Sequence, residues 1–183
     1  MVPPDRESVL KLLHTYIKDK RVLEHVRDTE LVMRALARRL GRDEELWGVA
    51  GLIHDLDIEL QEFDFTRHGE RTREILTTAG FHPELVETAI MHNDIWHGKE
   101  RTTDFQWALA SADRITWLIS ATARSTPDKS LASVTPEMVL DGYHDTNFGK
   151  NIDRKTITEC ERLGISLEEF ADLSLQAMQV GTS

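Results

Sequence analysis

The stretch Trp47-Gly-Val-Ala-Gly-Leu-Ile-His54-Asp55-Leu-Asp57-Ile-Glu59 joins an apolar run to an adjacent imidazole and carboxylate. Burying either group without a partner is costly, because desolvation opposes the charged carboxylate and leaves polar atoms unsatisfied. A divalent metal would satisfy both side chains, since imidazole nitrogen and carboxylate oxygen are good ligands for transition metals. The chain contains a second such pair, His144-Asp145, but polar residues surround it and we interpret it as a loop feature.

Composition indicates a soluble globular protein. The 183 residues are 40% hydrophobic and carry a net charge of −10, which argues against binding to a nucleic acid polymer. No apolar stretch approaches the roughly 20 residues that span a bilayer, and the N-terminus lacks the features of a signal peptide. The single cysteine, Cys160, fits a reducing compartment. We therefore expect one cytoplasmic domain over residues 1–183, without membrane association.

Apolar residues recur at intervals of three and four along most of the chain, and strand-like alternation persists nowhere. The sequence therefore predicts an all-α fold, a single-domain bundle of about eight to nine helices. Residues 57–66 are expected to form a loop that Phe63 and Phe65 anchor. The expected helices cover 6–20, 21–40, Asp43 to the His54-Asp55 pair, 67–79, Pro83 to His92, 103–124, Pro136–Gly142, Asp153–Leu163 and Leu167–Val180.

Five of these helices place a ligand-type side chain on or near a buried face. Taken singly, each has an ordinary explanation, such as a hydrogen-bonded core histidine or an aspartate paired with a neighbouring arginine. The joint pattern favours a metal site, because metal sites in helical proteins draw ligands from several facing helices. Such donors suit iron, manganese, cobalt, nickel or zinc. The candidate ligands are His25, His54, Asp55, His68, His92 and Asp113.

The order His25 … His54-Asp55 … Asp113 on successive helices resembles the HD-domain superfamily of metal-dependent phosphohydrolases. His68-Gly69, opening a helix, and Ala112-Asp113-Arg114-Ile115 are also similar to phrases of that family. The resemblance covers about residues 20–125, the expected HD core. The remainder, about 126–183, resembles the C-terminal helical extension of a small bacterial HD or HDIG-type branch.

The resemblance implies one or two divalent transition metals. His25, His54, Asp55 and Asp113 would hold the first, His68 and His92 the second, and Asp55 would lie between the two. The implied activity is hydrolysis of a phosphate ester, from a nucleotide or related small molecule, by metal-activated hydroxide, as a phosphomonoesterase or phosphodiesterase. Asp57 or Glu59 would assist in proton transfer. Phosphate contacts are expected from Arg67, Arg71 and Arg114, whose alternative is to form ion pairs with Glu70, Glu74 and Asp113.

Two departures from the family pattern, two alternative functions and the role of the C-terminal apolar residues remain open at the level of sequence. Asp57 and Ile58 stand where many two-metal members have Gly-Lys, and Asn93 stands where many have a second histidine. The same ligands also serve di-iron HD-type oxygenases, and a non-catalytic nucleotide-binding module is a further alternative. The apolar residues of the last helices cover the core or form the face of a homodimer: Leu167, Phe170, Leu173, Leu175 and Met178.

Overall fold

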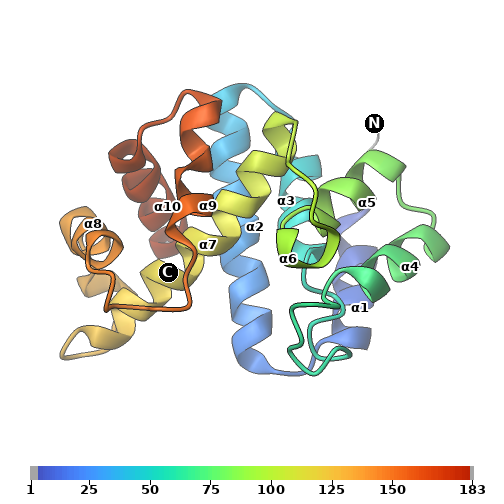
Figure 1. Cartoon of the computed structure of the whole chain (residues 1–183), viewed down its shortest axis with the longest axis horizontal. Coiled ribbons are helices and arrows are strands. Elements are labelled where there is room, and N and C mark those ends of the chain that lie inside the picture. The colour runs from blue at the N-terminus through green and yellow to red at the C-terminus, as the bar shows by residue number, and fades with distance from the viewer. Residues whose placement is uncertain (1–3, 182–183) are drawn as a thin grey trace.

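The computed structural model describes residues 4–181, and within that range every regular element is helical (Figure 1). The all-α prediction is confirmed. No helix of the described chain is both long and apolar enough to cross a membrane. The elements are α1 (Arg6–Tyr16), α2 (Lys20–Leu40), α3 (Glu44–Ile53), α4 (Glu70–Thr78), α5 (Pro83–Ile90), α6 (Asp94–His97), α7 (Asp104–Ser125), η1 (Leu131–Ser133), α8 (Pro136–His144), α9 (Arg154–Ile157), η2 (Thr158–Leu163) and α10 (Leu167–Gly181).

The two longest helices, α2 and α7, cross at the centre of the molecule (Figure 1). Asp19 begins α2 by accepting the Arg21 amide hydrogen, and Gly41 ends it in the left-handed conformation, which glycine adopts at little cost. The apolar residues that recur at intervals of three and four along α7 form a buried stripe. Phe105, Leu109, Ala112, Thr116, Ile119 and Ala123 are all buried.

Helix α3 packs so closely on α2 that the contact requires glycine. A Cβ atom on Gly51 would lie 2.6 Å from the backbone nitrogen of Glu30 and 2.7 Å from its Cα. These atoms belong to the backbone of another helix and therefore cannot move aside cheaply. The close approach brings the end of α3, where His54 lies, against the N-terminal half of α2, where His25 lies.

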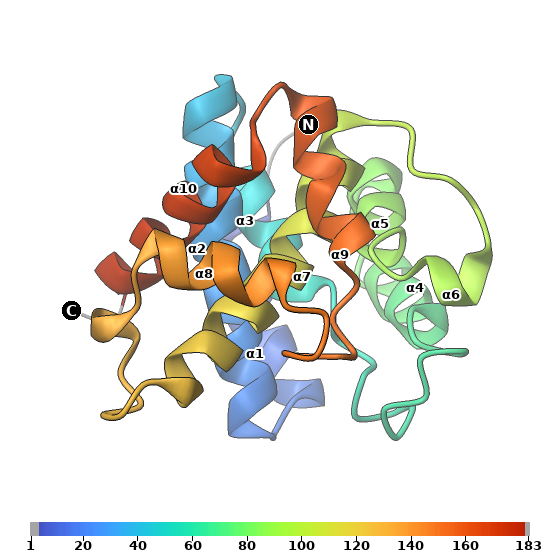
Figure 2. The same ribbon diagram turned by 60° about the vertical axis from the view of Figure 1, so that its left-hand side comes forward.

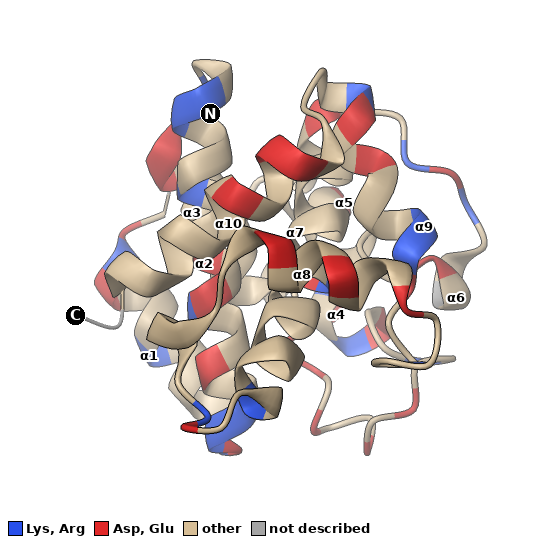
Figure 3. Ribbon diagram, turned by 90° about the vertical axis from the view of Figure 1, so that its left-hand side faces the viewer, with Lys and Arg blue, Asp and Glu red and all other residues tan. Residues whose placement is uncertain are grey.

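The C-terminal helices belong to the same core as the rest of the chain. Helix α10 lies along α2, and α8 lies against both α7 and α10 (Figures 1 and 2). Phe170, Leu175 and Met178 are between 0% and 2% exposed within the single chain. These three side chains and Leu167 take the core role, whereas Leu173 is half-buried, and the homodimer stays a prediction. The acidic residues of α8 and α10, coloured red on the ribbon in Figure 3, are exposed except for the half-buried Asp172.

Several predicted boundaries are wrong for identifiable reasons. The first helix ends at Tyr16 rather than residue 20, because the following residues turn the chain and Asp19 caps α2. The fourth begins at Glu70 rather than 67, after Gly69 with a φ of 114°. The short helix α6 lies in a segment predicted to be a loop, and the 153–163 helix changes from α to 3-10 geometry at Thr158.

The loop before α4 is irregular, as predicted, but its aromatic residues do not anchor it. Phe63 and Phe65 are 49% and 45% exposed. The segment is instead fixed by the buried carboxylate of Asp57 and by Asn93, whose Nδ2 donates to the Phe65 and His68 carbonyls at 2.8 Å each.

Candidate metal centre

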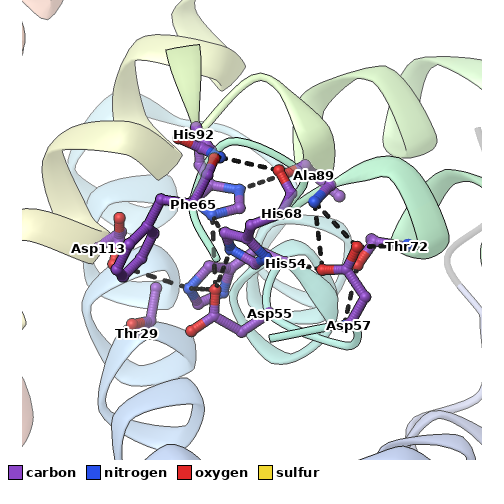
Figure 4. A network of polar contacts seen from close by, with 12 residues as sticks. Thr29, His54, Asp55, Asp57, Phe65, His68, Thr72, Ala89, His92 and Asp113 are labelled. Atoms are coloured by element: carbon purple, nitrogen blue, oxygen red, sulfur yellow. Dashed lines mark hydrogen bonds and ion pairs between the residues drawn. The ribbon is translucent and has the colours of Figure 1, made fainter. Parts of the chain in front are cut away.

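Five segments bring the six predicted ligands together. His25 lies on α2, His54 and Asp55 follow the last turn of α3, and Asp113 lies on α7. His68 lies in the turn before α4, and His92 lies two residues beyond α5. All six side chains are buried, and Asp55 is the most accessible of them at 7% exposed. Figure 4 shows His54, His68 and His92 around Asp55.

The first group of side chains is His25, His54, Asp55 and Asp113. His25 Nε2 lies 3.0 Å from Asp113 Oδ1 and 3.6 Å from Asp55 Oδ2. His54 Nε2 lies 3.3 Å from His25 Nε2 and 3.8 Å from Asp113 Oδ1. Ligand atoms of His25, His54 and Asp55 are close enough to one another to hold one ion.

The second group consists of Asp55, His68 and His92. Asp55 Oδ1 lies 2.9 Å from His68 Nε2 and 3.4 Å from His92 Nε2, and the two histidine Nε2 atoms are 2.9 Å apart. Their ligand atoms likewise converge within the reach of one ion. Asp55 is common to both groups, and a carboxylate has two oxygens, so it could lie between two ions.

Hydrogen bonds to the opposite ring nitrogens fix the orientation of the histidines. The Nδ1–H of His54 donates to the Gly51 carbonyl at 2.8 Å, and that of His92 donates to the Ala89 carbonyl at 2.6 Å. The Thr116 hydroxyl donates its proton to the Asp113 carbonyl. Its oxygen therefore accepts a hydrogen bond from His25 Nδ1–H at 3.2 Å. In these three rings the neutral form consequently presents an Nε2 lone pair to the centre.

Asp57 fixes the fourth ring. Its carboxylate is fully buried and accepts from His68 Nδ1 at 2.7 Å and from the backbone amides of Gly69, Arg71 and Thr72 at 2.9–3.2 Å. Burial alone would lower the pKa of His68, but Asp55 and Asp57 together raise that pKa to about 9. Burial lowers the pKa of His92 to about 4, so its ring is neutral.

The chemistry of this donor set fits a cation. Neutral His25 and His54 rings would set two Nε2 lone pairs 3.3 Å apart, which repel unless a proton or a metal ion lies beside them. Burial lowers the pKa of His54, but Asp55 and Asp113 raise it above the ordinary value, so the site favours a positive charge there. Burial raises the pKa of Asp55 and of Asp113. The largest opposing interaction is with His54 for Asp55 and with Arg114 for Asp113. Together with weaker interactions, these hold both pKa values well below the ordinary range. Asp113 Oδ2 is buried without a hydrogen bond, and its one ion-pair contact within residues 4–181 is the Arg114 guanidinium at 3.4 Å. A divalent transition metal would satisfy these atoms.

The predicted proton-transfer residues have other contacts. The carboxylate of Asp57 is saturated by four donors and is enclosed, so it positions His68 rather than facing a substrate. Glu59 Oε1 accepts the amide hydrogens of Lys18 and Asp19 at 2.9 and 2.8 Å, which fixes the turn between α1 and α2. Both carboxylates are thus engaged in structural contacts, Asp57 with the candidate ligand His68 and Glu59 with the turn before α2, and their role in proton transfer stays a prediction.

The predicted phosphate contacts form ion pairs. Arg67 pairs with Glu70 and Arg71 with Glu74, and both guanidinium groups are more than half exposed. Arg114 lies 3.4 Å from Asp113 Oδ2 with 17% of its side chain exposed, so it is the only one of the three that adjoins the cluster.

Sequence reasoning missed one residue that supports the site. Arg101 is 9% exposed, donates to the Met91 carbonyl at 2.9 Å and pairs with both oxygens of Glu159 at 2.6 and 2.8 Å. It thereby ties the segment that carries His92 to the C-terminal helices. No local pattern relates two residues 58 positions apart, so the sequence held no signal for this pair.

Comparison with known proteins agrees with this geometry. The family model described as HD domain matches residues 22–118, just over half of the chain and the part that supplies all six candidate ligands. No curated protein and no solved structure matches the chain. With an all-helical fold that presents His25, His54-Asp55 and Asp113 to one centre, the chain belongs to the HD domain family.

Proposed function

We propose that this protein is a metal-dependent phosphohydrolase that cleaves a phosphate ester of a nucleotide or a related small molecule. The observation that carries the proposal is the convergence of four imidazole Nε2 atoms on Asp55, with Asp113 beside them. Family membership supports it, because HD domains are generally metal-dependent hydrolases.

The first ion would be held by His25, His54, Asp55 and Asp113, and a second by Asp55, His68 and His92. When bound, such ions generate a nucleophile from water near neutral pH and neutralise charge on phosphoryl oxygens. The chain itself keeps the ligands in one orientation through Gly51, Ala89, Thr116 and Asp57, and it leaves none of the six ligand side chains more than 7% exposed.

The test combines elemental analysis with a substrate panel. We expect about two metals per chain in the wild type, falling to about one in His68→Ala/His92→Ala, because that variant retains only the first ligand group. His144→Ala removes an exposed histidine of the other His-Asp dipeptide and serves as the matched control. Phosphate release from a panel of monoesters and diesters should be lost in His54→Ala and retained in the control.

Other outcomes distinguish the alternatives. Bound iron together with dioxygen consumption, and no phosphate release, would identify a di-iron oxygenase. Tight nucleotide binding with neither activity would identify a binding module. A protein that neither contains nor takes up metal would refute the proposal.

A further inference from the structure

A pocket of about 680 Å³ lies between the N-terminal half of α2 and the C-terminal half of α7. We call it the α2–α7 pocket, and the residues that define it are Glu24, His25, Asp28, Trp117 and Arg124. His25 lines this pocket and also belongs to the first candidate metal group. Through His25 the α2–α7 pocket adjoins the first candidate metal group, so it is a candidate place for the organic part of a phosphate ester held there.

The wall that α2 contributes carries an unbalanced negative charge. Glu24 and Asp28 are four residues apart and so lie on one face of the helix, where two like charges destabilise each other. Neither forms a hydrogen bond or an ion pair with the rest of residues 4–181, although Asp28 is half-buried. Burial and the neighbouring Glu24 raise the pKa of Asp28 to about 6. Two carboxylates thus line the pocket without an ion pair of their own.

The pocket lining holds three carboxylates, Asp19 included, and two arginines, so one negative charge is in excess. Arg21 is paired with Asp19 at 2.7 Å, which leaves Arg124 as the remaining cation. Trp117 stacks on His25 at 4.3 Å between ring centroids and also lines the pocket, so an aromatic ring lies beside the two carboxylates. Carboxylates next to an aromatic ring are a combination that recognises organic ammonium groups.

We propose that the α2–α7 pocket selects phosphate esters whose organic part carries an ammonium group, which Glu24 and Asp28 receive. This inference rests on the proposed function only in placing the phosphate at the metal ligands. Asp28 lies about one helical turn from His25, roughly 5 Å along the axis. A short aminoalkyl chain spans that separation between a phosphate and its ammonium group.

The test measures binding with probes that resist hydrolysis, so its result does not depend on turnover. The manganese-loaded full chain is titrated calorimetrically with 3-aminopropylphosphonate and with butylphosphonate, which have equal numbers of heavy atoms and differ by one charge. We expect the amino compound to bind about tenfold more tightly or better, the effect of a cation near two partly exposed carboxylates. In Glu24→Gln/Asp28→Asn the ratio should fall to about one, with butylphosphonate affinity unchanged.

Arg124→Gln is the matched control, because it removes a charge of the opposite sign from the same pocket and should preserve the preference. Thermal melts verify that each variant is folded. Equal affinities in the wild type, no binding of either probe, or a preference that survives the double substitution would overturn the inference. Binding lost in Arg124→Gln and strengthened in the double variant would overturn it in favour of a second anionic group. A preserved preference without phosphate release from any ester would support the pocket assignment while refuting the hydrolase.

Discussion

Asp57→Asn tests whether this buried carboxylate positions a metal ligand or transfers protons. The substitution keeps the size of the side chain but replaces one acceptor oxygen by an NH₂ group. Three backbone amides at the start of α4 need the remaining oxygen, so the NH₂ group must face His68 Nδ1. His68 would then accept at Nδ1 and carry its proton on Nε2, the atom that faces Asp55 and His92. The lone pair available to a metal is thereby lost.

The size of the effect follows from the contacts that are removed. Loss of the charge-assisted bond to His68 costs about 1.5–3 kcal/mol, and loss of negative charge at the N-terminus of α4 costs roughly 0.5–1 kcal/mol. The free energy of unfolding should therefore fall by about 2–4 kcal/mol, which lowers Tm by roughly 5–15 °C for a chain of this size. Affinity for the second metal should fall about 10–100-fold, the usual effect of removing a hydrogen-bond partner of a ligand.

The pH dependence of this stability difference has a defined sign. Burial opposes the ionised form of Asp57, but the bond from His68 and the backbone amides lower its pKa below the ordinary 3.8. The stabilisation is therefore present above pH 3.8 and is lost as pH falls through the folded pKa. The pKa of His68 is raised from the ordinary 6.5 to about 9. The stabilisation that His68 contributes is therefore complete below pH 6.5 and is lost as pH rises through about 9. In metal-free protein the stability difference between wild type and variant should be largest between pH 3.8 and pH 6.5, where both shares are complete.

The assays are thermal melts across pH, metal titration and phosphate release, with Asp64→Asn as a control at an exposed carboxylate of the same loop. The reasoning is refuted if Asp57→Asn retains full stability and both metals but loses turnover. That result would support the proton-transfer role that the sequence suggested for Asp57.

Three further predictions concern His68, Asp28 and Gly51. The pKa of His68 is about 9, so a metal ion must displace its proton in order to bind. Affinity for the second ion, measured by chelator competition, should therefore rise about tenfold from pH 7 to pH 8. An unchanged affinity would contradict the assignment of His68 as a ligand. Asp28→Asn should stabilise the protein by about 1–3 kcal/mol at pH 7. The pKa of Asp28 is about 6 in the folded protein against an ordinary 3.8, so its ionisation costs stability. Thermal melts of wild type and variant should show the gain at pH 7 and none below pH 3.8. Gly51→Ala should destabilise by about 3 kcal/mol or more in denaturant titrations, because its Cβ would meet the Glu30 backbone; a wild-type midpoint would show that α2 and α3 separate easily.

Periodicity in the sequence predicted the helical fold and most of the candidate centre. The intervals of three and four along α2 and α7 identify their buried faces, and His25 and Asp113 occupy those faces because helical geometry is local. His54-Asp55 follows an apolar helix that has nowhere to lie except in the core. The family motif rests on the same residues, so the sequence alone also identified the HD domain.

Only the tertiary structure decided what each polar atom contacts. Asp57 lies in a segment predicted to be a loop, and the turn at Gly69 folds the start of α4 back onto its carboxylate. Glu59 reaches the turn before α2, and Arg101 meets Glu159 across 58 residues of sequence. Local patterns determine which face of a helix is buried. The partner of a buried charge depends on how distant helices pack, and spacing along the chain carries no record of that.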